Sequence, residues 1–307
     1  AWRSSVSPWR TWWPRPALCW PEAPKDSLIT QAGPIDWAGF FVTMSYRFPH
    51  IIIIGAGRSG TTSLQSLLNS DPSVIIRGEN NNFFYETWRA YRSLKKINNG
   101  KSKSNPWYGF EHFDAGTYLE NIQTLSRSFL TGDYQDQAIK VLGFKEICLF
   151  NLFNSQGPSS LKQSLLLANR SPEEELKDFV HYMEQLFPGL KVVFLRRNPT
   201  QISRSGWRKD RSRYNPEILV ADLKRFHKAC KKLSKSIEGV CINHRILRSK
   251  NPTTLHELLY KPLDLPFNKH RSLKTLEEEL THSKWHHLSI PNQEIKKNPA
   301  SRSEAGT

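Results

Sequence analysis

The sequence predicts an α/β fold of three layers, in which helices flank a central parallel sheet. Four short segments are mostly apolar and have the length of buried strands, namely residues 50–54, 139–144, 191–195 and 239–243. Longer segments between them have the periodicity of amphipathic helices. Strands that alternate with helices at this spacing are typical of a parallel sheet that is covered on both faces.

The predicted helices begin at recognisable signals. The first starts near Thr61 and places three leucines on one face. The clearest helix starts at Pro172, because Ser171 and Glu174 can form a capping box around its first turn. Further helices are expected from Pro199, after Pro216 and over residues 253–260. The polar stretch of residues 87–137 has no clear period, and we interpret it as an insertion over the active site.

The chain has 307 residues, and residues 44–290 are expected to form its one folded domain. Residues 1–43 are rich in tryptophan and proline without any period, so we predict that they are a disordered or non-native extension and that translation naturally starts at Met44. A tryptophan-rich docking arm is the alternative for this segment. The polar residues 291–307 are expected to be a disordered tail.

Charge and cysteine content narrow the classes of function. Lysine and arginine exceed aspartate and glutamate by 16, which favours anionic partners such as nucleotides, acidic glycans or nucleic acid. The four cysteines are scattered, so a disulfide framework or a zinc site is not expected. No apolar run has the roughly 18 residues that a membrane span requires. These features indicate a soluble cytoplasmic protein.

A glycine-rich loop, GAGRSG, stands where the first strand ends and the first helix begins, at residues 55–60. Backbone N–H groups converge at such a junction and favour a bound anion. The ATP-binding version of the loop ends in Gly-Lys-Ser/Thr, and its lysine contacts the phosphates. Here Thr61 and Thr62 follow Gly60 directly, and the positive charge comes from Arg58 inside the loop. The fold is therefore P-loop-like, without the P-loop lysine.

Two other classes of nucleotide-binding protein are alternatives for this loop, namely a dinucleotide-binding protein and a kinase or NTPase. The dinucleotide-binding pattern GxGxxG is matched, and Glu79 lies near the distance at which that pattern requires an acidic residue. A kinase or NTPase would need an acidic residue at the end of a buried strand to hold magnesium. The strand of residues 191–195 runs instead into Arg196 and Arg197, which disfavours metal-dependent NTP chemistry.

A second anion site is predicted after that strand. Arg197 follows it, a turn at Asn198 and Pro199 comes next, and a helix is expected to present Ser205 eight residues beyond the arginine. An arginine can contact a phosphate at two points, and a serine hydroxyl can add a third hydrogen bond. Because both anion sites follow strands of one parallel sheet, we expect them to be neighbours.

The combination of GAGRSGTTSL with RRNPTQISRS resembles the sulfotransferases that use 3′-phosphoadenosine 5′-phosphosulfate (PAPS), in particular bacterial and carbohydrate-type members. The resemblance implies that PAPS is the co-substrate, that no metal takes part, and that Arg197 and Ser205 bind its 3′-phosphate. It assigns the 5′ side of PAPS to the loop and the start of the helix, through Gly57, Arg58, Ser59, Gly60, Thr61, Thr62 and Ser63.

The same resemblance implies in-line transfer of the sulfuryl group to an acceptor hydroxyl, with a carbohydrate as the acceptor. Arg58 would stabilise the departing phosphate. Glycan-modifying relatives have a glutamate shortly after the first helix, before an aromatic pair, so Glu79 is the candidate base. Glu146 is the alternative base, and Lys145 beside it is a candidate for stabilising charge. A basic nucleic-acid-binding module, and a relative that binds PAPS without turnover, are the remaining alternatives.

Overall fold

The computed structural model describes residues 49–97, 112–132, 139–157, 170–209 and 214–285, all within one compact unit that starts at Tyr46. Its elements are β1 (His50–Gly55), α2 (Thr61–Leu68), β2 (Val74–Arg77), α3 (Phe83–Ile97), α4 (Ala115–Thr131), β3 (Val141–Glu146), η2 (Cys148–Leu152), α6 (Pro172–Leu186), β4 (Lys191–Arg196), α7 (Pro199–Ser203), η3 (Gly206–Lys209), α8 (Pro216–Leu233), β5 (Gly239–Asn243), α9 (Arg245–Ser249), α10 (Pro252–Leu255), η4 (His256–Tyr260) and α11 (Lys269–Trp285).

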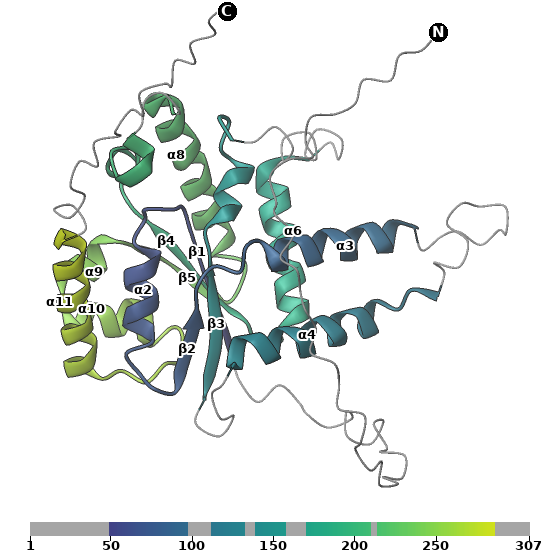
Figure 1. Ribbon diagram of the computed structural model, residues 1–307, viewed down its shortest axis with the longest axis horizontal. Helices are drawn as coiled ribbons and strands as arrows, with labels where there is room; N and C mark the ends of the chain where they lie inside the picture. The colour runs from purple at the N-terminus through teal and green to yellow at the C-terminus, as the bar shows by residue number, and fades with distance from the viewer. Residues whose placement is uncertain (1–48, 98–111, 133–138, 158–169, 210–213, 286–307) are drawn as a thin grey trace, which may run out of the picture. The chain divides into compact units, whose positions relative to one another are not determined.

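The described strands form one parallel sheet of five, in the order β2-β3-β1-β4-β5 (Figure 1). Strand β1 lies at the centre and pairs with β3 on one side and β4 on the other. All six residues of β1 are buried, which explains its uninterrupted apolar character. A sheet that helices cover on both faces has no solvent-facing positions to place polar residues on. The predicted α/β fold is confirmed.

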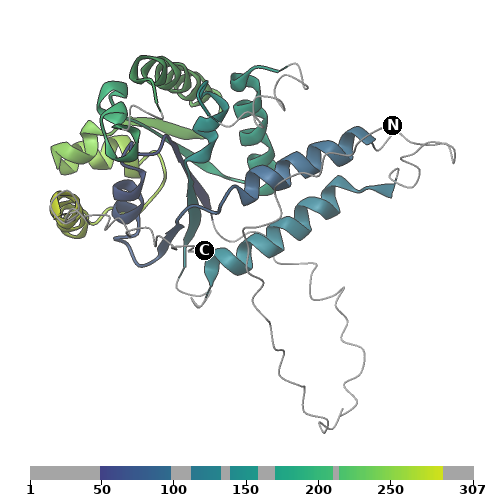
Figure 2. The same ribbon diagram turned by 45° about the horizontal axis from the view of Figure 1, so that its top comes forward.

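Alternate residues of the central strand β1 pack into two separate cores, as the pleat of a strand requires. Ile52 and Ile54 of β1 belong to the core beneath α3, α4, α6 and α8. Ile51 and Ile53 belong to the core beneath α2, α9, α10 and α11. Figures 1 and 2 show these two sets of helices on opposite sides of the sheet, which gives the three predicted layers.

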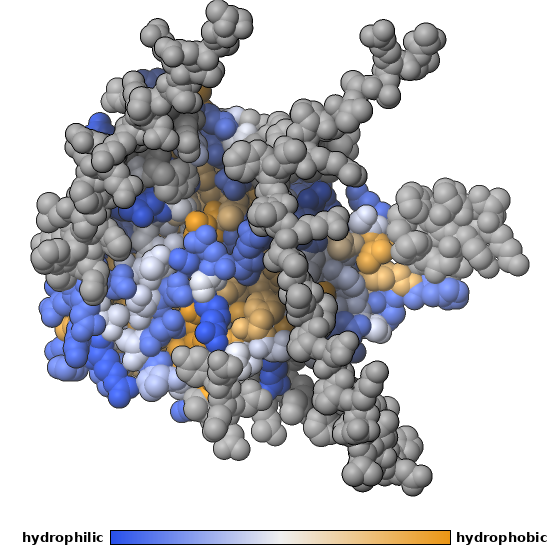
Figure 3. All heavy atoms as spheres, in the orientation of Figure 1, coloured by the Kyte–Doolittle hydropathy of each residue, from blue (hydrophilic) through white to orange (hydrophobic). Residues whose placement is uncertain are grey.

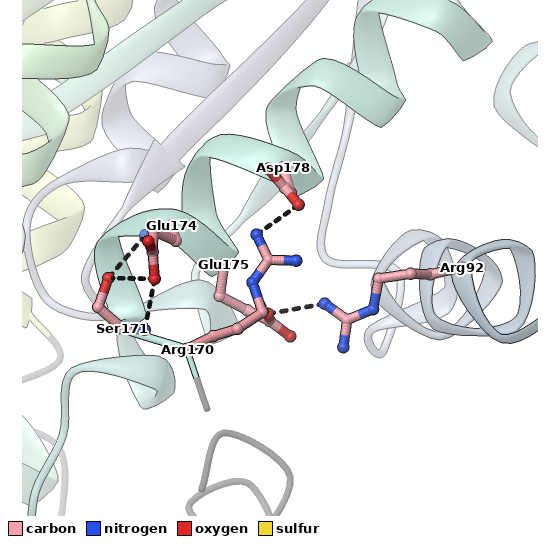
Figure 4. Close-up of polar contacts among 6 residues, drawn as sticks. All are labelled: Arg92, Arg170, Ser171, Glu174, Glu175 and Asp178. Carbon is pink, nitrogen blue, oxygen red and sulfur yellow. Dashed lines mark hydrogen bonds and ion pairs between the residues drawn. The ribbon is translucent and has the colours of Figure 1, made fainter. Parts of the chain in front are cut away.

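Helix α6 begins as the sequence predicts. The Ser171 hydroxyl accepts a hydrogen bond from the backbone N–H of Glu174, and the Glu174 carboxylate accepts one from the N–H of Ser171 (Figure 4). Glu175, in the same turn, is buried, and its Oε2 accepts a hydrogen bond from Nη1 of Arg92 on α3 at 2.7 Å. Arg170 pairs with Glu175 as well, so this buried charge, which would be costly alone, is compensated.

Several elements differ from the prediction. The strand β2 was not predicted, because its four residues are too few to distinguish from a loop. The stretch of residues 87–137 contains most of α3 and all of α4, and α11 is a further helix beyond the predicted ones. Strand β3 covers residues 141–146 and not 139–144. The predictions for residues 1–43 and 291–307 concern segments outside the described residues.

The described helices bear on the prediction that no segment of the chain spans a membrane. Among the described helices, none combines the length and the apolar character that crossing a bilayer needs.

Candidate functional site

The candidate site lies along the edge of the sheet where the parallel strands end. Pairing places Gly55 of β1 beside Leu195 of β4, and Ile54 beside Glu146 of β3. The segments that follow β1, β3 and β4 therefore leave the sheet side by side. These segments carry the glycine-rich loop, Lys145 with Glu146, and Arg197, so the topology brings the two predicted anion sites to neighbouring strand ends.

The loop after β1 has the backbone of an anion site. Arg58 has a φ of 70° and Gly60 a φ of 99°, so the chain turns twice through the left-handed region. Among the described residues, no side chain caps the N-terminus of α2, so the N–H groups of its first turn can donate to a ligand. The Ser59 hydroxyl is buried and has no hydrogen-bond partner among the described residues. Non-glycine residues in left-handed conformations gather at ligand sites.

Direct contacts join the two predicted anion sites. Nη1 of Arg197 donates a hydrogen bond to the carbonyl oxygen of Arg58 at 3.1 Å. Nε of Arg58 lies 3.4 Å from the hydroxyl of Ser205 and donates to it. The loop arginine therefore contacts both members of the second site.

Ser205 itself is placed differently from the prediction. Helix α7 ends at Ser203, so Ser205 lies in the turn that follows and not on the helix. Gly206, with a φ of 58°, comes next, and a Cβ atom there would approach Nε of Arg58 to 2.8 Å. The absent side chain leaves the space through which Arg58 reaches Ser205.

A basic pocket of about 340 Å³ adjoins Arg197 on the side of β5. Four of the described residues in its wall are arginines, namely Arg196, Arg197, Arg245 and Arg248. The other described lining residues are Asn198, Pro199, Gln201, His227, Asn243 and His244, and none of those described is acidic. Burial, followed by the charges of Arg248 and Arg58, lowers the pKa of Arg197. Crowded cations of this kind are stabilised by a bound anion. The sequence signal for this pocket is NHRILR, which begins at the last residue of the predicted strand at residues 239–243.

Two histidines of this pocket are held neutral. Burial, and then the charges of Arg197 and Arg248, lower the pKa of His244 to about 4. Burial, and then Arg196, lower the pKa of His227 to about 4. His244 also packs against the loop, because a Cβ atom at Gly60 would come within 2.3 Å of its Cδ2. Both rings therefore contribute shape and hydrogen-bonding groups at pH 7, and no charge.

The lowered pKa values of His227 and His244 predict that the fold loses stability in acid. Both folded pKa values lie below the ordinary histidine value of 6.5, so the unfolded chain binds protons first as the pH falls. The free energy of unfolding should therefore decrease between about pH 6.5 and pH 4. A His227→Gln/His244→Gln variant should show a shallower decrease of the melting temperature over this range than the unchanged protein. The exposed His270, replaced by glutamine, is the control; equal slopes in all three proteins would contradict the prediction.

A second group of predicted residues meets on the other side of the loop. Nζ of Lys145, at the end of β3, donates a hydrogen bond to the Thr62 hydroxyl at 2.9 Å. The same nitrogen lies 3.4 Å from Oε1 of Glu79. The Lys145 side chain is 10% exposed and that of Glu79 is 41% exposed, so the lysine is fixed while the carboxylate faces solvent. One lysine thus connects the anion loop with the candidate base.

Glu146, the alternative base, is enclosed. It is 1% exposed, and its Oε1 accepts a hydrogen bond from the backbone N–H of Cys148 at 2.8 Å. Burial is the main cause that raises the pKa of Glu146, and the charge of Glu79 raises it further. Its Oε2 is buried without a hydrogen-bond partner among the described residues. Solvent reaches the side chain of Glu79 but not that of Glu146.

Thr61, Thr62 and Ser63, which follow the loop at the start of α2, do not all face the candidate site. Thr61 is buried beneath the loop, whereas Thr62 is exposed. The Ser63 hydroxyl lies 3.5 Å from the carboxylate of Glu279 on α11, on the opposite side of α2. Within the described part of the chain, no three His, Cys, Asp or Glu side chains are arranged to hold a metal ion.

A comparison with models of protein families identifies the family of this chain. Residues 49–268 match the sequence model of the sulfotransferase family. A search of curated protein sequences gives no significant match.

Solved structures of low sequence identity are similar to the chain. A sulfotransferase from Alicyclobacillus acidocaldarius is 17% identical, with a TM-score of 0.39, over 76% of this chain and 90% of that one. The sulfotransferase domain of the Synechococcus PCC 7002 olefin synthase is 13% identical, with a TM-score of 0.43, over 75% and 78% of the two chains. The family match spans well over half of the chain, from the first strand to beyond the last. The chain therefore belongs to the sulfotransferase family.

Proposed function

We propose that this sulfotransferase uses PAPS as the donor and transfers the sulfuryl group to a hydroxyl of a carbohydrate, with Glu79 as the base. The observation that supports this most strongly is the pair of contacts that Arg58 makes with Arg197 and Ser205. A ligand with phosphate groups at two positions can occupy the loop and the arginine–serine pair at once only if these lie together.

The donor is held at both ends by groups of this chain. The loop N–H groups and the start of α2 offer hydrogen bonds to the 5′-phosphosulfate. Arg197 and Ser205 offer a two-point contact and a hydroxyl to the 3′-phosphate. The basic pocket beyond Arg197 adds Arg248 and the neutral ring of His244 on that side. Because these groups neutralise the phosphates, the proposed reaction needs no metal.

In the transfer step, the acceptor oxygen forms a bond to sulfur while the bond from sulfur to the 5′-phosphate oxygen breaks. Negative charge then grows on the departing phosphate, and the products are the sulfate ester and the desulfated donor. Arg58, the loop N–H groups and Lys145 surround the place where this charge develops. Fixed donors of this kind stabilise a transition state without any cost of reorganisation.

Glu79 receives the proton of the acceptor hydroxyl. Its carboxylate is accessible, and its ion pair with Lys145 holds it beside the loop. The lysine, which also contacts Thr62, fixes the carboxylate relative to the bound donor. Glu146 lacks this access, and we assign it a structural role at the start of η2.

Binding and turnover assays test the proposal. The protein should bind the desulfated donor in the presence of EDTA, and it should convert labelled PAPS to a sulfated product with hydroxyl-bearing glycans. A kinase or NTPase would instead bind ATP only with magnesium, and a nucleic-acid-binding module would bind RNA or DNA with a steep dependence on salt. Absence of any affinity for PAPS and for its desulfated product would refute the proposal.

A further inference from the structure

A second pocket, of about 420 Å³, opens beside Glu79 on the side away from Arg197. Residues 77–80, which follow β2, form one wall, and Phe144 of β3 lies in the lining. The end of α4 forms the other wall, with Phe129, Leu130 and Gly132. Because the candidate base is itself a lining residue, a ligand bound in this pocket can present a hydroxyl to Glu79.

The described wall has two charged side chains, Arg77 and Glu79. Nε and Nη2 of Arg77 donate hydrogen bonds to the carbonyl oxygens of Leu130 and Thr131, at 2.8 and 2.9 Å. Glu79 is paired with Lys145. Among the described lining residues, no other side chain is charged. The charges of the described lining therefore balance, in contrast to the basic pocket on the other side of the loop, whose described wall has four arginines and no acidic residue.

The apolar part of the wall continues outward along α4. Phe129 is 40% exposed although its ring packs against Phe83 and Phe84, with centroids 5.3 and 5.9 Å apart. Leu125, one turn earlier on the same side of the helix, is 50% exposed. In Figure 3, apolar surface gathers where the end of α4 meets β3, with hydrophilic surface around it. An aromatic ring fixed by two others is suited to hold the flat apolar side of a ligand.

We propose that the acceptor is an uncharged amphipathic alcohol: a sugar-like hydroxyl headgroup in the pocket beside Glu79, joined to an apolar group that lies on Phe129 and Leu125. The inference rests on the proposed function and adds the class of acceptor to it. An uncharged headgroup follows from the balanced charges of the described lining, one arginine and one glutamate. The apolar group follows from the two exposed side chains that lead away from the pocket.

A matched pair of acceptors tests this inference. Octyl β-glucoside, kept below its micelle concentration, and methyl β-glucoside carry the same headgroup and differ only in the apolar group. We expect kcat/KM to be at least about tenfold higher for the octyl compound, since several buried methylene groups contribute. Phe129→Ala and Leu125→Ala should each reduce this ratio without weakening binding of the desulfated donor. Ile218→Ala, an equally exposed apolar change on α8, should leave the ratio unchanged.

A binding measurement separates this inference from the proposed function. Saturation-transfer NMR on the protein with bound desulfated donor should detect the octyl chain, and Phe129→Ala should abolish the signal. Absence of that signal, or equal kcat/KM for the two glucosides, would overturn the inference even if PAPS is consumed. If Phe129→Ala alters the oligomeric state and not the acceptor ratio, the apolar surface is an interface between copies, and the inference is wrong. Failure of the proposed function is recognised separately, by the absence of any donor binding.

Discussion

Replacement of Glu79 by glutamine is expected to lower kcat by a factor of about 10² to 10⁴, the usual contribution of a general base. Glutamine keeps the size of the side chain and can still accept a hydrogen bond from Lys145, but it cannot take up the proton of the acceptor. The affinity for the desulfated donor should change little, because the carboxylate lies on the acceptor side of Lys145. Rapid-quench measurement of a single turnover, together with calorimetric titration of the desulfated donor, checks both parts.

Glu146→Gln is the matched comparison for this variant, because Glu146 is the alternative candidate for the base. Glutamine at this position retains the carbonyl oxygen that accepts the hydrogen bond from the N–H of Cys148. Since the side chain is enclosed and its pKa is raised, loss of its charge should alter kcat only a few-fold. If Glu146→Gln abolishes turnover while Glu79→Gln does not, the two assignments have to be exchanged.

The sequence was sufficient to predict that the two candidate anion sites are neighbours, because their relative position follows from one rule of parallel sheets. Strands that run in the same direction end at the same edge, so segments that follow neighbouring strands meet there. The central position of β1 between β3 and β4 could not be read from the sequence, since strand order depends on which helices cross which face. The contact between Arg58 and Arg197 required that order.

The acceptor side was much harder to predict. Residues 74–77 are too short a strand to recognise, and α4 shows its apolar residues on two sides. Leu130 packs into the core, while Leu125 and Phe129 remain exposed. An apolar stripe that serves both a core and a ligand surface lacks a clean helical period. The mixture of polar and apolar residues in α4 hides its helical period in the sequence. The end of the same helix forms one wall of the pocket beside Glu79.

Arg197→Ala is expected to weaken binding of the desulfated donor by about 10- to 100-fold, the loss typical when hydrogen bonds to a charged group are removed. The guanidinium is half-buried beside Arg58 and Arg248, so water replaces it poorly. Its hydrogen bond to the Arg58 carbonyl is lost as well, which should loosen the loop. Arg271→Ala, on the exposed side of α11, makes the same change of net charge away from the site and should have little effect.

Two ligands that differ only in the 3′-phosphate test whether Arg197 binds that phosphate. The unchanged protein should bind adenosine 3′,5′-bisphosphate more tightly than adenosine 5′-monophosphate, and Arg197→Ala should bind the two with similar affinity. Arg58→Ala should weaken both ligands, because Arg58 lies in the loop that holds the shared 5′-phosphate and also contacts Ser205. Calorimetric titrations of both ligands with the three proteins give the coupling between the arginine and the 3′-phosphate. If Arg197→Ala keeps its preference for the bisphosphate, the 3′-phosphate is bound elsewhere, and Arg245 and Arg248 of the basic pocket become the candidates for its site.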